Sequence, residues 1–193
     1  MSMTRIGDEH ARTGGVRCTR RGFLQIGAGI AAGMAVPAVF ASRGLQQERT
    51  IGFLNLHTGE KLQTTYWSDG DYVSSGLGEI NDLLRDHRSG EVFDMDPQLL
   101  DLLFLLQAQV ASPGKFHIIS GYRSPATNEK LRKTSSGIAR RSYHMQGKAV
   151  DIRLPGCDLK HLHKSALALK AGGVGYYQKS NFIHVDTGPV RSW

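Results

Sequence analysis

The chain is organised around two short stretches, SYHMQGKAVD at residues 142–151 and FIHVD at residues 182–186. Together they supply two imidazoles and one carboxylate, from His144, Asp151 and His184. Zinc is bound in proteins by such nitrogen and oxygen ligands, and a catalytic site keeps one further position open for water or substrate. We therefore predict one zinc ion per chain, held by these three side chains.

The spacing within the two stretches allows the ligands to meet. Gly147 lets the chain turn after the first histidine, and residues 148–153 then have the composition of a short strand. Side chains alternate between the two faces of a strand, so Asp151 points away from its apolar neighbours, and His184 and Asp186 share one face of the second stretch. If the two strands are neighbours, all three of these side chains lie in one cleft.

Two roles are open for Asp186. Hydrolysis by an activated water needs a base that takes the water proton and passes it to the leaving group. Asp186 is our candidate for this base, because it lies on the ligand face of its strand. The alternative is that its carboxylate orients one of the two histidines by a hydrogen bond. Ser142 is predicted to support the turn or contact substrate, since no arrangement for nucleophilic attack surrounds it.

Residues 1–41 have the features of an export signal. The run TRRGFLQ at residues 19–25 contains a twin-arginine pair, and an apolar run rich in Gly and Ala follows it. The small residues before Ser42 form a cleavage site of the usual kind. We predict a cleaved twin-arginine signal at 1–41, a mature domain at 42–193 and a periplasmic location without stable membrane association. An uncleaved membrane anchor is the alternative.

Composition limits the remaining possibilities. With 193 residues and 40% hydrophobic content, the chain is long enough for one domain with a core. Its net charge is +7, and the part after residue 41 holds 19 basic and 15 acidic residues, a charge of +4. Such a surface suits an anionic polymer such as a cell wall, and no basic-aromatic array points to nucleic acid. Cys157 has no motif around it and is predicted to have no role. The oligomeric state is left undetermined.

Periodicity predicts the main elements of the mature domain. Strands are expected at 49–56, 60–67 and 115–120, and helices at 75–87, 98–110, 125–131 and 158–170. The helix at 98–110 is apolar on most sides and is therefore expected in the core. Asp96, Ser124 and Asp158 are the expected N-caps of three of these helices.

Several stretches resemble one family of zinc peptidases. They are NLHTGE (55–60), SGYRSP (120–125), the His144-to-Asp151 run, GVGYY (173–177) and IHVDTGPVR (183–191). The family includes D-Ala-D-Ala carboxypeptidases, VanX-type dipeptidases, L-Ala-D-Glu peptidases and the hedgehog signalling domain. Within it, the chain is most similar to twin-arginine-exported murein endopeptidases of the MepK type, over nearly the whole mature domain. The resemblance implies a single α+β domain, with helices around a small antiparallel sheet whose cleft holds zinc.

The same resemblance implies a role for Arg123. In this family the arginine of the SGYRS stretch points into the cleft, where it polarises the scissile carbonyl or holds a substrate carboxylate. A guanidinium suits that task because it is always charged and binds two oxygens at once. The alternative is a structural ion pair. The sequence departs from the family at Asn181, where many relatives have a glutamate, and an amide cannot serve as a base.

The implied function is a zinc-dependent endopeptidase that cuts peptide cross-links in murein, with links between two diaminopimelate residues as the expected target. Its partners are then the peptide stems of peptidoglycan. Two alternatives remain at this point. One is a carboxypeptidase that removes terminal residues from murein peptides. The other is a zinc-binding or wall-binding module without catalysis, as in the hedgehog domain.

Overall fold

The structure is a computed structural model that describes residues 48–135 and 137–193. The predicted export signal at 1–41 lies outside the described residues. Within the described part, no helix is both long enough and apolar enough to cross a membrane.

The described chain alternates between strands and helices. The strands are β1 (Arg49–Asn55), β2 (Lys61–Ser68), β3 (Asp71–Tyr72), β4 (Phe116–Ser120), β5 (Ala149–Arg153), β6 (Gly173–Tyr177), β7 (Phe182–Asp186) and β8 (Arg191–Ser192). The helices are α1 (Ser74–Leu83), α2 (Pro97–Gln109), α3 (Pro125–Thr134) and α4 (Leu159–Leu169), with the 3-10 turns η2 (Tyr143–Gln146) and η3 (Gln178–Ser180). The predicted α+β domain is confirmed.

The strands form one sheet in the order β3-β2-β1-β4-β5-β7-β6-β8. Most neighbours are antiparallel, but β1 and β4 run parallel, as do β6 and β8. The sheet is therefore larger than predicted and mixed. The β1–β4 pairing requires a crossover connection, and this connection contains the β2–β3 hairpin and helices α1 and α2.

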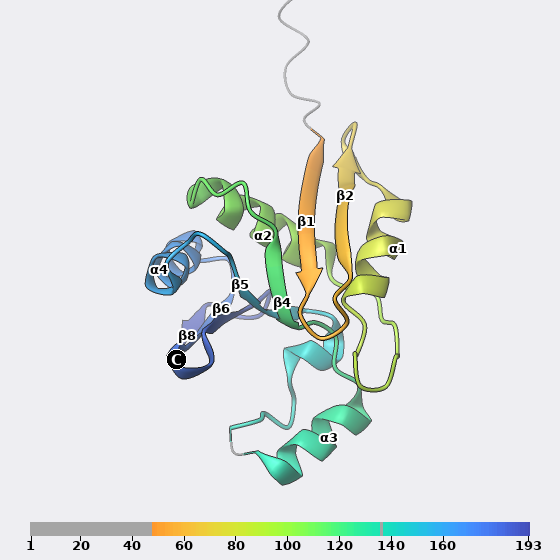
Figure 1. The fold of residues 1–193 in the computed structure, drawn as a ribbon, viewed down its shortest axis with the longest axis vertical. Coiled ribbons are helices and arrows are strands. Elements are labelled where there is room, and N and C mark those ends of the chain that lie inside the picture. The colour runs from red at the N-terminus through yellow and green to blue at the C-terminus, as the bar shows by residue number, and fades with distance from the viewer. Residues whose placement is uncertain (1–47, 136) are drawn as a thin grey trace, which may run out of the picture. The chain divides into compact units, whose positions relative to one another are not determined.

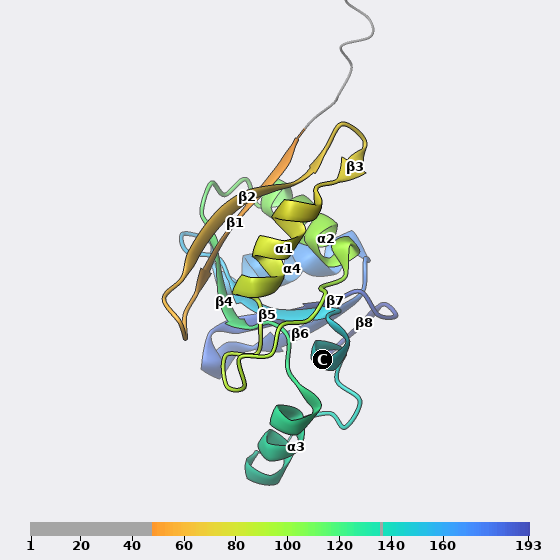
Figure 2. The ribbon, with the colours of Figure 1, turned by 90° about the vertical axis from the view of Figure 1, so that its right-hand side faces the viewer.

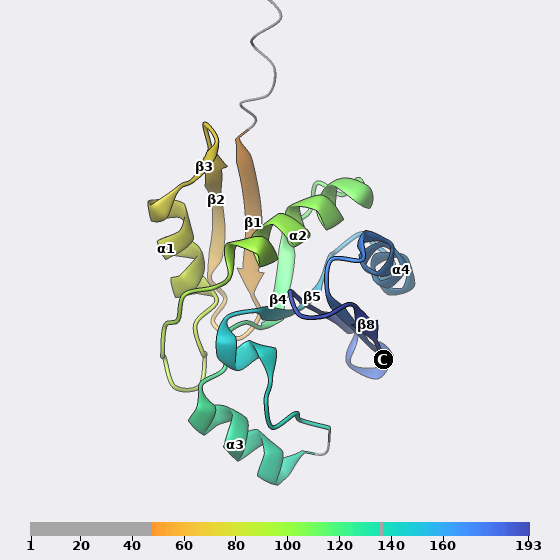
Figure 3. The ribbon, with the colours of Figure 1, turned by 180° about the vertical axis from the view of Figure 1, so that it is seen from behind.

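The helices α1, α2 and α4 lie together on one side of the curved sheet, whereas α3 stands apart from them (Figures 1 and 2). Seen from behind, α2 crosses β1 and β4 (Figure 3). Asp96 caps α2 by accepting a hydrogen bond from the Gln98 amide, and Leu99, Leu100 and Leu103 of this helix are fully buried. The predicted core helix is thus confirmed, although its Leu105 is 53% exposed.

Helix α1 ends four residues earlier than its sequence pattern predicts. The carbonyl of its last residue, Leu83, accepts a hydrogen bond from the side-chain amide of Asn55. The chain then turns away, and the buried Asp86 accepts hydrogen bonds from the amides of Arg88 and Ser124. Because Ser124 belongs to the loop that follows β4, its bond to Asp86 ties that loop to the segment after α1.

The register of the central strands brings the predicted ligands together. Asp151 of β5 lies opposite His184 of the neighbouring β7. Their neighbours along each strand, including Val150, Ile152 and Ile183, are fully buried in the core. The side chains of Asp151 and His184 therefore leave from the other face of the sheet.

Candidate metal centre

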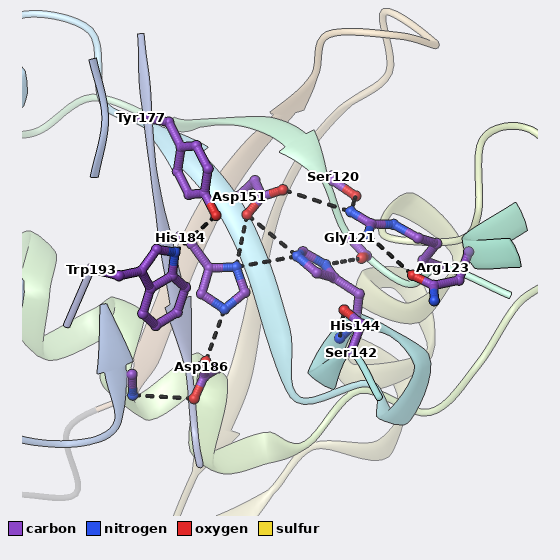
Figure 4. Close-up of polar contacts among 12 residues, drawn as sticks. Ser120, Gly121, Arg123, Ser142, His144, Asp151, Tyr177, His184, Asp186 and Trp193 are labelled. Atoms are coloured by element: carbon purple, nitrogen blue, oxygen red, sulfur yellow. Dashed lines mark hydrogen bonds and ion pairs between the residues drawn. The ribbon is translucent and has the colours of Figure 1, made fainter. Parts of the chain in front are cut away.

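His144, Asp151 and His184 converge on one point (Figure 4). Each offers one ligand atom, and the three atoms lie within 4.8 Å of one another. The Nε2 atom of His144 is 3.2 Å from Nδ1 of His184. The Asp151 Oδ1 atom is 2.9 Å from the same Nδ1 and 3.3 Å from the His144 Nε2. No other group of this kind occurs among the described residues.

The outer nitrogen of each histidine has its own partner. His144 Nδ1 is 2.8 Å from the carbonyl oxygen of Gly121, and His184 Nε2 is 2.8 Å from Oδ2 of Asp186. Both partners are acceptors, so both outer nitrogens carry the ring proton. When the rings are neutral, the inner nitrogens are then left with lone pairs that point at the centre, which is the form in which histidine binds a metal.

These distances fit a zinc ion. Zinc bonds of about 2.0–2.2 Å in a tetrahedral site place neighbouring ligand atoms about 3.3–3.6 Å apart. Two of the three observed separations, 3.2 and 3.3 Å, are close to the lower end of this range, and the third, 2.9 Å between Asp151 and His184, is a hydrogen-bond distance that would lengthen when a metal replaces the proton. A cation between the three atoms would also relieve the repulsion between converging lone pairs.

Local sequence explains how His144 is placed. The Ser142 hydroxyl accepts a hydrogen bond from the His144 amide and caps the turn η2. Gly147 ends the turn with a φ of 65°, in the left-handed region that favours glycine. A Cβ atom at this position would also collide with the carbonyl oxygen of Asp94. The supporting role predicted for Ser142 agrees with this geometry.

Asp186 is fully buried, with 0% of its surface exposed. Its Oδ1 accepts hydrogen bonds from the amides of Gly173 and Gly188 at 3.1 and 2.9 Å and from Arg191 at 3.0 Å. Its Oδ2 accepts from Arg191 at 2.7 Å and from His184 at 2.8 Å. Asp186 is absent from the cleft lining. This geometry favours the orienting role over that of the base.

Electrostatics in the centre depend on the histidines and carboxylates together. Burial opposes ionisation of Asp151, but the imidazoles of His144 and His184 outweigh it and hold the pKa of this carboxyl well below its usual range. Burial likewise opposes the charged form of His184, yet hydrogen bonds to Asp151 and Asp186 raise its pKa. A bound metal would compete with that proton, because ligands must be deprotonated to bind.

Arg123 lies beside these three residues, as the family resemblance implied. Its side chain is only 10% exposed and lines the same cleft. One guanidinium nitrogen is 3.9 Å from Asp151 Oδ2 and 3.4 Å from the Ser120 hydroxyl. Its Nε atom is buried without a hydrogen-bond partner among the described residues. Burial lowers the pKa of the guanidinium, against the attraction of Asp151.

Comparison with known proteins places the chain in a family. Residues 43–193 match the family described as peptidoglycan L,D-endopeptidase MepK. The chain belongs to the MepK family. It is 41% identical over 177 residues to peptidoglycan L,D-endopeptidase MepK of Escherichia coli K12, a match that covers 90% of this chain and 96% of that relative. It is 40% identical to a probable MepK of Haemophilus influenzae, with 90% and 95% covered.

The chain has a weaker likeness to a solved structure. This is the crystal structure of the Serratia marcescens L-Ala D-Glu endopeptidase ChiX. It is 18% identical, with a TM-score of 0.37, and the match covers 48% of this chain and 80% of that chain.

The cleft of this MepK family member has a volume of about 380 Å³. Besides the predicted residues, it is lined by Arg141, Tyr177, Arg191 and Trp193. Sequence reasoning assigned no chemistry to Tyr177, Arg191 and Trp193, whereas Arg141 belongs to a basic run (130–141) for which contact with an acidic glycopeptide is the expectation. Tyr177 and Arg191 do fall within stretches that carry the family resemblance, which is the signal that pointed to them.

Asn181, by contrast, does not line this cleft. It ends the turn η3 with a φ of 54°, a left-handed conformation that asparagine tolerates better than most residues. Asparagine therefore suits the conformation of this turn.

Proposed function

We propose that the chain is a zinc-dependent peptidoglycan L,D-endopeptidase that hydrolyses peptide cross-links between stems. The observation that carries the proposal is the convergence of two anchored imidazoles and one carboxylate at an open cleft. The names of the relatives, which share about two fifths of its residues, agree with this chemistry.

We propose one zinc ion as the resident metal, held by His144, Asp151 and His184. The donor set of two imidazoles and one carboxylate is one that zinc enzymes use, with one position left for water or substrate. Zinc bound there would acidify its water toward neutral pH and polarise the scissile carbonyl. Asp186 then keeps the ring of His184 in the tautomer that leaves Nδ1 free, rather than acting as the base.

Arg123 is proposed to contact the substrate carbonyl as charge develops on its oxygen. The guanidinium is fixed by burial and stays charged next to Asp151. A donor that is already oriented before reaction stabilises such charge without the cost of reorganisation. The ion pair with Asp151 is compatible with this role, because the guanidinium also faces the cleft.

The proposed substrate is a peptide stem of murein, with the link between two diaminopimelate residues as the target. Arg141 lines the cleft and is exposed, so it offers a positive charge to the carboxylates of such a stem. We propose that residues 42–193 act in the periplasm after removal of 1–41. Neither nucleic acid nor a membrane is a proposed partner.

The proposed function is tested with purified residues 42–193 on isolated sacculi, with His184→Ala as the inactive control. Mass spectrometry should show cross-linked dimers lost and monomers gained. Release of terminal residues from monomers, with dimers left intact, would support the carboxypeptidase instead. Zinc binding without turnover of any murein substrate would support the non-catalytic module.

The proposed location has its own test. Replacement of Arg20 and Arg21 by Lys should keep the precursor in the cytoplasm, because the twin-arginine pathway reads that pair. Cell fractionation measures the result. Unchanged delivery of the mature protein would rule out this route.

A further inference from the structure

Tyr177 ends strand β6 and presents its side chain to the cleft that holds the predicted metal ligands. Gly175 pairs with His184 across β6 and β7, and His184 pairs with Asp151 across β7 and β5. Because residues two apart share a face of a strand, Tyr177 lies on the same face as those two ligands. In Figure 4, the Tyr177 hydroxyl is at the end of its ring that is nearer to His184 and Asp151.

The Tyr177 hydroxyl has one partner recorded among the described residues. The indole Nε1 of Trp193 is 2.9 Å from it. An indole N–H only donates, so the phenol oxygen accepts this bond and keeps its own proton for another partner. The phenol ring also stacks on Phe182, with ring centroids 4.6 Å apart and planes 17° from parallel. Ring and oxygen are thus both oriented, in a residue that lines the cleft.

The position of Trp193 is itself built into the sheet. A Cβ atom on Gly175 would lie 2.7–2.8 Å from three atoms of the indole. The absence of a side chain at Gly175 therefore creates the space that the indole occupies. The Trp193 amide and carbonyl pair with β6, at the carbonyl of Val174 and the amide of Tyr176, and its ring lies 5.2 Å from that of His184.

We propose that Tyr177 is a catalytic residue, whose hydroxyl donates a hydrogen bond to the substrate oxygen that becomes negatively charged, and that Trp193 positions it. This inference rests on the proposed function. When water adds to the scissile carbonyl carbon, a C–O bond forms and the carbonyl π pair moves onto oxygen. Tyr177 donates a hydrogen bond to that oxygen and keeps its own proton, while the proton that the water gives up ends on the leaving amine nitrogen as the C–N bond breaks. It supplies a neutral donor in addition to the cation of Arg123.

The test compares Tyr177→Phe with the unchanged protein on a purified muropeptide dimer joined by a diaminopimelate–diaminopimelate link. Loss of one oriented donor to such an oxygen lowers kcat on the order of 100-fold, whereas KM should change less than about two-fold because the ring is kept. Zinc content should be unchanged. Tyr176→Phe is the matched control, since its ring lies near His163 of α4, on the other face of the sheet, and its kcat should be that of the unchanged protein.

Two further variants test the role of Trp193. Trp193→Phe removes the N–H that orients the hydroxyl, together with part of the ring area, but leaves the phenol in place, so kcat should fall by less than in Tyr177→Phe. In the double variant Trp193→Phe/Tyr177→Phe, kcat should equal that of Tyr177→Phe alone, because Trp193 acts through the hydroxyl that is already absent. Gly175→Ala displaces the indole and should resemble Trp193→Phe.

The outcomes separate this inference from the function on which it rests. If the unchanged protein cuts the dimer and Tyr177→Phe has the same kcat, the Tyr177 assignment is wrong and the endopeptidase stands. A rise in KM alone would make Tyr177 a wall of the substrate site, which also overturns the assignment. If the unchanged protein cuts no cross-linked dimer, the proposed function and the role of Tyr177 are both rejected.

Discussion

Two pairs of histidine rings lie in contact within the described part of the chain, and the two pairs differ in the angle between their ring planes. His144 and His184 meet edge to face, with ring centroids 5.0 Å apart and planes 67° from parallel. His57 and His87 stack at 3.8 Å with planes only 6° apart. The lone pairs of an imidazole lie in the plane of its ring, so crossed rings can aim them at one point and stacked rings cannot.

The surroundings of the two pairs differ in the same sense. A carboxylate, from Asp151, lies between the crossed rings and completes the set of ligand atoms. The stacked pair belongs to no such group of ligand atoms among the described residues. His57 Nε2 is 3.0 Å from the carbonyl oxygen of Ile119, and burial and the nearby charges of Arg88 and His57 outweigh the carboxylate of Asp86 and lower the pKa of His87 to about 4. Proximity of two histidines is therefore not sufficient for a metal site. The centre at His144 and His184 differs because a nitrogen of each ring and an oxygen of Asp151 converge on one point.

The largest expected effect is at the crossed pair. His184→Ala should lose both zinc and activity, by more than the roughly 100-fold that loss of an outer-shell partner causes. His87→Gln, at the stacked pair, should keep both. Metal analysis of the two purified variants measures the difference. Full zinc occupancy in His184→Ala would remove it from the ligand set, and loss of zinc in His87→Gln would cancel the distinction between the pairs.

The second effect is at the partner that orients His184. Asp186→Ala leaves the amides of Gly173 and Gly188 without their buried acceptor, so we expect a loss of about 1–3 kcal/mol in unfolding free energy. Zinc affinity should fall about 10–100-fold. Chemical denaturation and titration against a chelator measure the two quantities. Unchanged zinc affinity together with a large loss of rate would instead make Asp186 the base.

A smaller effect is expected where a backbone group orients His144. Its partner is the carbonyl of Gly121, so no side chain can be deleted to test it. Gly121→Ala would place a Cβ atom against the carbonyl of Leu84, and overpacking of this kind costs about 1–3 kcal/mol. The displaced loop should weaken zinc binding less than Asp186→Ala does. A variant with unchanged stability and affinity would show that the loop adapts freely.

The smallest effect concerns pH and the stacked pair. The pKa of His87 is about 4 in the folded protein and 6.5 for the free side chain. Between these values the unfolded chain binds more protons, so stability rises as pH increases from 4 to 6.5 and is lost as pH falls. The slope should be below about 1.4 kcal/mol per pH unit, because solvent screens the partly exposed ring.

His87→Gln should flatten this dependence without affecting zinc content. Unfolding free energies at pH 5 and pH 7.5 for the two proteins provide the measurement. Equal slopes in both would contradict the lowered pKa.

Several elements were predictable because the forces that form them are local. The hairpin of β1 and β2 follows from two β-rich runs around a turn. The caps by Asp96, Ser124 and Asp158 need only a short polar side chain before a helical run, and the structure has all three. The early end of α1 was not predictable, because it depends on Asp86 binding an amide far away in the sequence.

The sequence by itself determined which residues are suited to the centre. A histidine and an aspartate around a glycine turn, and a second histidine in an alternating strand, place their side chains on one face through backbone geometry alone. Tertiary structure decided which partners the neighbouring residues bind. Asp186 alternates onto the ligand face, yet its oxygens are occupied by Arg191 and two backbone amides. Its burial, like the hydrogen bond between Tyr177 and Trp193, arises from contacts between separate strands and loops, and strand periodicity carries no information about them.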